Sequence, residues 1–175
     1  NVCATCLEAT GTRWSAEEKA FFAQANPFGF ILFARNSENP DQVRALTSEM
    51  REAVGRDAPI LIDQEGGRVQ RMRAPHWREW APAREEIARA GAHAEEVMYL
   101  RSRIMAYELR ETGVDTNCAP LVDVICPDTH EFLTHRCYGD DPARVAQIGR
   151  SVADGLLAGG VLPVVKHMPG HGRGT

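Results

Sequence analysis

The sequence predicts an α/β fold, a TIM (β/α)8 barrel of which this chain covers about the first five βα units, since a complete barrel takes ~250 residues. Strand and helix signals alternate along the 175 residues. The strand signals are continuous apolar runs, as in parallel strands buried on both faces. Polar residues follow several successive strands, which is typical of barrel enzymes. A doubly wound sheet is the alternative, but the glycine-rich turn that usually follows its first strand is missing from this sequence.

Each expected strand is a short apolar run. Phe-Gly-Phe-Ile-Leu-Phe-Ala at residues 28–34 is the clearest, and Pro-Ile-Leu-Ile at 59–62 is the next. Such runs, flanked by Gly, Pro, Asn or Asp, favour buried strands over helices. The full set of expected strands is 2–7, 28–34, 59–62, 114–121 and 162–165.

Helix signals separate these strands. Asn39 and Pro40 open a helix, apolar residues then recur at helical spacing, and Gly55 ends it. Gly113 closes a long helical stretch, and two glycines end the last helix. The expected helices are 40–54, 83–111 and 141–157. We treat 1–175 as the N-terminal part of one barrel domain.

Composition excludes several function classes. Hydrophobic residues make up 43% and charged residues 25%, with a net charge of -4 and both signs interspersed. A soluble globular protein has this composition, whereas a nucleic-acid binder needs a basic patch. An apolar stretch near the ~20 residues of a membrane span is absent from the sequence, as is a signal-peptide pattern at its start. We therefore expect a cytoplasmic protein without nucleic-acid or membrane partners.

The five cysteines fit the same setting. Their odd number and irregular spacing do not resemble a disulfide framework, which favours a reducing compartment. Cys3 and Cys6 could form half a zinc site or a redox pair, but a zinc ribbon needs a second Cys pair. We favour small residues of a first strand and expect no metal and no cofactor.

The segment 60–71 holds the first candidate site residues. Asp63 and Glu65 follow a buried strand, and two glycines then allow a sharp turn. Alternation along the strand places both carboxylates on one face. Asp63 could accept hydrogen bonds from two sugar hydroxyls or bind a metal. Alternatively, Asp63 caps a loop and Arg68 or Arg71 neutralises it.

Lys166 and His167 follow the last expected strand. Adjacent residues point to opposite sides of a strict strand, so both reach one ligand only if the strand has given way to a loop. Pro169 and Gly170 favour such a loop. Lys166 could bind hydroxyls or act as a Schiff-base nucleophile. The alternative is a lysine that extends to solvent beside a structural histidine.

Arg136 lies between the strand that ends near residue 121 and the last helix. Its planar guanidinium could hold a hydroxyl or a carboxylate, or it could pair with Asp140 or Asp141. Asp123 and Asp128 lie in the same stretch and are equally compatible with turn positions.

Residues 62–71 and 166–172 together resemble glycoside hydrolase family 3, and more narrowly its bacterial cytoplasmic β-N-acetylhexosaminidases of peptidoglycan recycling. The likeness continues in order through residues 30–36, 117–124 and 135–139. The resemblance implies a TIM barrel that hydrolyses terminal β-linked N-acetylglucosamine from muropeptides with retention of configuration. It further implies a monomer whose partners are GlcNAc-anhydroMurNAc peptides.

By motif position, the resemblance implies that five residues bind the sugar, namely Asp63, Arg71, Arg136, Lys166 and His167. The family's nucleophile is an Asp on a later strand, and its acid/base is a His in an Asp-Ser-His triplet. Neither is in this sequence, so we expect both beyond Thr175 and expect the chain alone to be inactive. We do not assign His171 to the acid/base role. A Schiff-base aldolase using Lys166 and a non-catalytic sugar-binding fragment remain alternatives.

Overall fold

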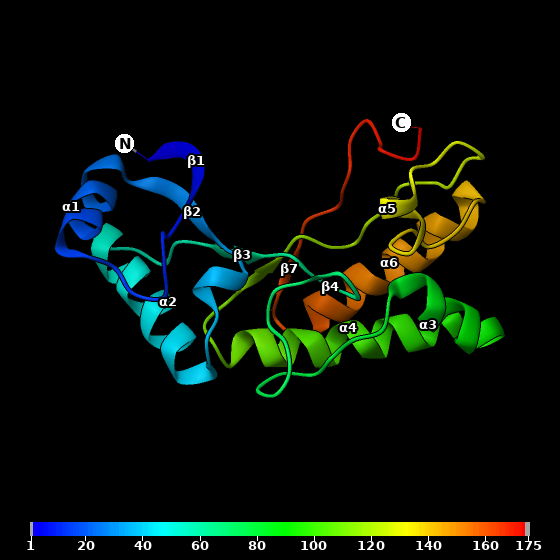
Figure 1. The fold of residues 1–175 in the computed structure, drawn as a ribbon, viewed down its shortest axis with the longest axis horizontal. Coiled ribbons are helices and arrows are strands. Elements are labelled where there is room, and N and C mark those ends of the chain that lie inside the picture. Colours follow the sequence, from blue (N-terminus) through cyan, green and yellow to red (C-terminus); the bar gives the residue numbers. More distant parts are fainter. Residues whose placement is uncertain (1, 174–175) are drawn as a thin grey trace.

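The computed structural model describes residues 2–173, and its centre is a five-stranded parallel sheet (Figure 1). The strands lie side by side in chain order and are β1 (Cys3–Glu8), β2 (Pro27–Leu32), β3 (Ile60–Ile62), β6 (Thr116–Asn117) and β7 (Leu162–Pro163). A doubly wound sheet reverses its strand order at a switch point, whereas a barrel adds each strand on the same side. The order observed here is therefore that of a barrel.

Helices connect the strands and cover the sheet. They are α1 (Ala16–Ala25), α2 (Pro40–Val54), α3 (Ala83–Ala90), α4 (Ala94–Arg110), α5 (Glu131–Thr134) and α6 (Pro142–Ala158). Figure 1 shows α4 and α6 side by side on one side of the sheet. Two short strands, β4 (Gln64–Gly66) and β5 (Val69–Gln70), form an antiparallel hairpin directly after β3.

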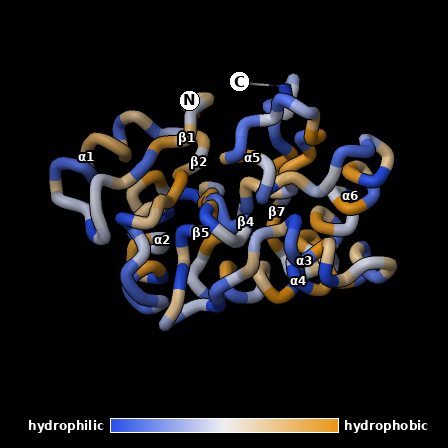
Figure 2. Tube along the Cα trace, turned by 45° about the vertical axis from the view of Figure 1, so that its right-hand side comes forward, coloured by the Kyte–Doolittle hydropathy of each residue, from blue (hydrophilic) through white to orange (hydrophobic). Residues whose placement is uncertain are grey.

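The hydrophobic core lies between the sheet and the helices. Leu32 and Ile62 of the sheet are fully buried, as are Met50 of α2 and Leu109 of α4. Figure 2 shows a hydrophobic β2 and hydrophobic parts of α6. Burying such a side chain stabilises the fold by roughly 1.5–3 kcal/mol.

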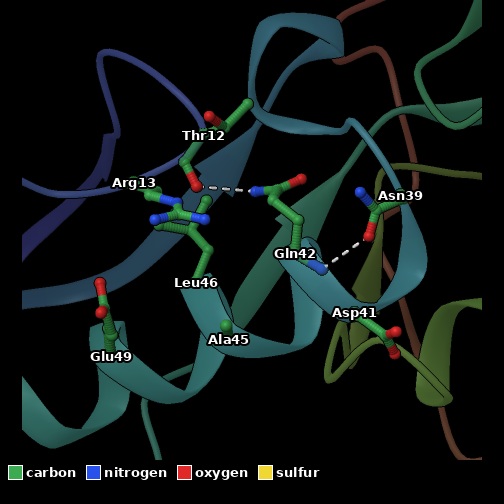
Figure 3. A pocket seen from close by; sticks show the side chains of 8 residues that line it. All are labelled: Thr12, Arg13, Asn39, Asp41, Gln42, Ala45, Leu46 and Glu49. Carbon is green, nitrogen blue, oxygen red and sulfur yellow. Dashed lines mark hydrogen bonds between the residues drawn. The ribbon is translucent and has the colours of Figure 1, made fainter.

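The start of α2 fixes the loops that follow β1 and β2. The Asn39 side chain caps the helix by accepting from the Gln42 amide at 3.0 Å, and Gln42 Nε2 donates to the Thr12 carbonyl at 2.8 Å (Figure 3). Nε2 also donates to the Asn36 carbonyl at 3.1 Å. A cavity of about 440 Å³ lies beside these contacts. Three residues that line it, Thr12, Asn39 and Gln42, are thus engaged in holding loops.

The sequence predicted the bounds of α2, which runs from Pro40 to Val54, with Gly55 at a φ of 64° after it. It missed α1, whose Ser15 and Glu18 form a capping box. The single helix expected at 83–111 is wrong, because Gly91, with a φ of 55°, begins a 3-10 turn, η2 (Gly91–His93), between α3 and α4.

The strands are shorter than expected at their carboxyl ends. The strand predicted at 114–121 is reduced to β6, and the one predicted at 162–165 to β7. Pro120 and Pro163 have no amide hydrogen to donate, which limits regular pairing here. One isolated parallel bridge still joins Leu121 to Lys166.

Two further findings concern membranes and metals. Within residues 2–173, the structure contains no helix with the length and hydropathy to cross a membrane. Cys3 and Cys6 lie in β1 as expected and are free thiols. Over the same residues, the structure has no group of three or more Cys, His, Asp or Glu side chains arranged to bind a metal.

Candidate functional site

Two carboxylates and a lysine meet where β3 and β7 end. The carboxyl ends of parallel strands lie at the same edge of a sheet, so the residues that follow them come together. Lys166 Nζ lies 2.8 Å from Asp63 Oδ1 and 2.6 Å from Glu65 Oε1. The first of these contacts joins residues 103 positions apart in the chain.

Two arginines complete this ion-pair cluster, which we define as Asp63, Glu65, Arg71, Arg136 and Lys166. Arg71 Nη2 donates to Asp63 Oδ2 at 3.0 Å, and Arg136 donates to both Glu65 oxygens at 2.9 and 2.8 Å. Three cations thus face two carboxylates, which leaves a formal charge of +1. Arg71 Nε is a buried donor without a partner. The cluster therefore contains one buried donor that the described residues do not satisfy.

A buried amide network holds the chain that carries Asp63 and Glu65. Asn117 of β6 accepts from the Gln64 amide at 3.0 Å and donates to the Gln64 carbonyl at 2.9 Å. The Gln64 side chain in turn accepts from the Arg71 amide at 3.0 Å. Arg101, itself buried, donates to the Glu65 carbonyl at 2.9 Å. Because every polar group here is paired, the network fixes the two carboxylates in place.

Charge and burial act in opposite directions on the cluster. Burial raises the pKa of the Asp63 carboxyl, but hydrogen bonds and charge from Lys166 and Arg71 outweigh it, so the pKa lies below its usual value. Burial lowers the pKa of Arg136, yet hydrogen bonds and charge from Glu65 raise it overall. Asp63 is therefore ionised at neutral pH and can accept hydrogen bonds from a ligand.

The lowered pKa of Asp63 predicts a specific acid dependence of stability. A depressed folded-state pKa stabilises the protein fully above the unfolded-state value of about 3.9, and this stabilisation is lost as pH falls through the folded-state value. The difference in unfolding free energy between wild type and Asp63→Asn should stay constant from pH 7 to 5 and shrink below about pH 4. Urea unfolding at each pH measures this difference. A difference that already shrinks between pH 7 and 5 would contradict the assignment.

His167 contacts a different carboxylate. The peptide bond between Lys166 and His167 is cis. His167 Nδ1 lies 2.6 Å from Asp123 Oδ2, and its ring stacks on that of His171 at a centroid distance of 4.4 Å. A cleft of about 550 Å³ lies beside this pair, lined by Asp123, Val165, His167 and Met168 among others. Both residues of the Lys-His pair thus face carboxylates, as a frayed strand end allows.

The structure decides some of the sequence alternatives. Arg136 pairs with Glu65, so the expected alternative partners Asp140 and Asp141 are wrong. Asp63 is neutralised by Arg71, as the structural alternative for that residue proposed, and by Lys166 as well. Four of the five predicted sugar-binding residues lie in the ion-pair cluster; their binding of a sugar stays a prediction.

Two residues of the site were not among the five predicted sugar-binding residues. Glu65 bridges Arg136 and Lys166, and its position two residues after Asp63 was the available signal. Asp123 is buried and contacts His167, although its sequence is equally compatible with a turn. Its place two residues after the buried Leu121 resembles a strand end and could have marked it.

The sequence matches a known protein family. The profile of the glycosyl hydrolase family 3 N-terminal domain matches residues 4–175. The chain belongs to glycosyl hydrolase family 3. The beta-hexosaminidase of Methylococcus capsulatus is 38% identical over 166 residues, covering 95% of this chain and 49% of that protein. The beta-hexosaminidase of Pseudomonas aeruginosa is 36% identical, and the match covers 95% of this chain and 48% of that protein.

Solved structures agree. NagZ from Neisseria gonorrhoeae, in complex with N-trifluoroacetyl-D-glucosamine, superposes with a TM-score of 0.89 at 28% identity, over 98% of this chain and 51% of that one. A family 3 β-N-acetylglucosaminidase from Paenibacillus superposes with a TM-score of 0.85 at 28% identity. The match covers 96% of this chain and 32% of that one. The chain thus spans about half the length of the curated relatives it matches. Its five parallel strands are part of the TIM barrel of family 3.

Proposed function

We propose that this chain is the substrate-holding part of a retaining β-N-acetylglucosaminidase, and that residues 1–175 are the N-terminal part of one barrel domain. The proposal rests on the ion-pair cluster, in which Asp63 and Lys166 meet at the carboxyl edge of the sheet. Active sites of TIM barrels lie at this edge. The relatives named beta-hexosaminidase and the NagZ complex with an N-acylglucosamine support the same substrate class.

In this proposal, the cluster grips the sugar hydroxyls. Asp63 accepts hydrogen bonds from two hydroxyls, while Lys166 and Arg136 donate to the hydroxyl oxygens. Charge-assisted hydrogen bonds of this kind each contribute ~1.5–3 kcal/mol. Arg71, the fourth sugar-binding residue, also holds Asp63 through Nη2 at 3.0 Å. His167, beside Lys166, is the fifth sugar-binding residue.

Holding the sugar serves a two-step reaction. A retaining glycosidase needs a nucleophile that forms a glycosyl-enzyme and an acid/base that first protonates the leaving oxygen and then activates water. By family resemblance, an Asp and a His outside this chain supply these two roles. The residues of this chain set the sugar in attack geometry, on which the rate depends steeply.

The natural substrate we propose is a GlcNAc-anhydroMurNAc peptide released during peptidoglycan recycling in the cytoplasm. The enzyme acts on it as a monomer and without a cofactor. The relatives' names support the sugar, while the peptide-bearing leaving group and the compartment follow from the family resemblance alone.

A Schiff-base aldolase has less support. Its lysine must present a free amine lone pair to a carbonyl. Lys166 Nζ instead donates to two carboxylates at 2.8 and 2.6 Å, so it is engaged in ion pairs and not presented to a carbonyl.

Hydrolysis of 4-nitrophenyl β-N-acetylglucosaminide by the full-length protein tests the proposal, with the corresponding β-glucoside as control substrate. We expect release of nitrophenolate and, by NMR, the β-anomer of the sugar as the first product. Calorimetry with N-acetylglucosamine on the same sample provides the second readout. Binding without hydrolysis would favour the sugar-binding alternative, and the absence of both would reject the proposal. A borohydride-trapped adduct on Lys166 would favour the aldolase.

A further inference from the structure

Asp123 is the most completely buried carboxylate at this edge of the sheet among the described site residues. Its side chain has 0% exposure, compared with 17% for Asp63 and 7% for Glu65. A buried carboxylate is costly unless each oxygen has a hydrogen-bond partner. Both oxygens of Asp123 have one, and both partners belong to the segment that follows β7. The buried carboxylate of Asp123 therefore binds the segment that follows β7.

The first oxygen orients the ring of His167. Asp123 Oδ2 lies 2.6 Å from Nδ1, close enough for a hydrogen bond. With the carboxylate as the acceptor of this bond, the ring hydrogen resides on Nδ1. A neutral ring in this tautomer has a lone pair on Nε2. Within residues 2–173, the structure gives Nε2 no hydrogen-bond partner, so this acceptor is free for a ligand.

The second oxygen fixes the chain that follows. Asp123 Oδ1 accepts from the His171 backbone amide at 2.6 Å. Gly172, which follows His171, accepts a hydrogen bond at its carbonyl from the Thr129 hydroxyl. Its backbone lies so close to the Val124 carbonyl oxygen that a Cβ on Gly172 would be 1.9 Å from it. The backbone of residues 171–172 is therefore held directly against the loop that carries Asp123.

We propose that Asp123 is a positioning residue, which fixes the Nδ1–H tautomer of His167 and thereby presents Nε2 as an acceptor to a sugar hydroxyl. The hydroxyl that accepts a hydrogen bond from the Lys166 ammonium still has its own hydrogen to donate, and Nε2 receives it. A lysine donor and a histidine acceptor in neighbouring positions thus select a group that both accepts and donates. This inference rests on the proposed glycosidase function and extends it to a residue outside the ion-pair cluster.

Asp123→Asn tests the tautomer. The amide keeps the shape and retains one oxygen for the His171 amide, but it places an NH2 group opposite Nδ1. The ring should then carry its hydrogen on Nε2, which can no longer accept from the hydroxyl. Loss of one such contact predicts a ~10- to 100-fold rise in KM with a smaller change in kcat, because the contact exists in both the ground state and the transition state.

The experiment combines 15N NMR of the histidine rings with steady-state kinetics on the full-length protein. Asp128→Asn is the matched control, since Asp128 is exposed and lies in the same loop. His167→Gln assigns the His167 signals. We expect an Nδ1–H ring in wild type and in Asp128→Asn, an Nε2–H ring in Asp123→Asn, and a raised KM only in Asp123→Asn.

Failure of this inference is separable from failure of the proposed function. The ring tautomer is measured without substrate, so it can overturn the inference even if the protein hydrolyses no glycoside or Asp123→Asn fails to fold. An Nε2–H ring in wild type would overturn the inference. A switched tautomer with an unchanged KM would also overturn it, as would a KM in Asp128→Asn raised as much as in Asp123→Asn.

Discussion

Replacing Asp63 with alanine is expected to lower kcat/KM for 4-nitrophenyl β-N-acetylglucosaminide by about 10²- to 10³-fold, the effect of truncating one partner of a buried charge pair. The variant loses the acceptor for two sugar hydroxyls. It also removes the carboxylate that Arg71 contacts at 3.0 Å and one of the two that Lys166 contacts, at 2.8 Å. Lys166 then keeps only its contact with Glu65 within the cluster, so both cations can shift and misplace the remaining sugar contacts.

Steady-state kinetics on the full-length protein measures this effect. Asp57→Ala is the matched control, because that side chain is 90% exposed and its ion pair with Arg51 lies at the surface. The control should retain activity within about twofold, as surface ion pairs contribute little. Circular dichroism confirms that both variants fold. An Asp63→Ala enzyme as active as the control would remove Asp63 from the site.

Gly66→Ala is expected to lower the free energy of unfolding by about 2–5 kcal/mol, combining backbone strain with overpacking. Gly66 has a φ of 102°, which disfavours any side chain. Its Cβ would lie 2.1 Å from Arg101 Nη2 and 2.7 Å from the Ala81 carbonyl oxygen. Arg101 would have to leave the two carbonyls that it contacts, including that of Glu65.

Two other glycines separate the causes of this loss. Gly55 has a φ of 64° but open space around it, and Gly11 has neither a positive φ nor a close neighbour. Urea unfolding should show a loss of about 1 kcal/mol for Gly55→Ala, from backbone conformation alone, and almost none for Gly11→Ala. A Gly66→Ala variant no less stable than Gly55→Ala would mean that Arg101 does not hold this turn.

The sequence predicted the parts of the site that depend on strand ends. Asp63 and Lys166 each follow an apolar run, and parallel strands deliver both to the same edge of the sheet. Chain order was sufficient here, because each new strand lies beside the previous one. The helix from Pro40 to Val54 was equally predictable, since its cap, its periodicity and its final glycine are all local.

Pairings across the fold could not be read in this way. Arg136 has acidic neighbours in sequence, but it pairs with Glu65, 71 residues away. Which carboxylate Arg136 pairs with depends on how the loop after β6 folds over the β4–β5 hairpin, and no local sequence pattern encodes this. The role of Asp123 likewise appears only when His167 and the His171 amide are placed against it. The helix α1 was missed for a different reason, as its apolar residues lack helical periodicity and only its capping box marks it.

A crystal structure of the full-length protein with bound N-acetylglucosamine tests the central claim most directly. The account predicts the sugar at the carboxyl edge of the sheet, with its hydroxyls within about 3.2 Å of Asp63, Arg136 and Lys166. A sugar bound elsewhere while Lys166 remains closed on Asp63 and Glu65 would contradict it, since the ion-pair cluster would then serve the fold alone.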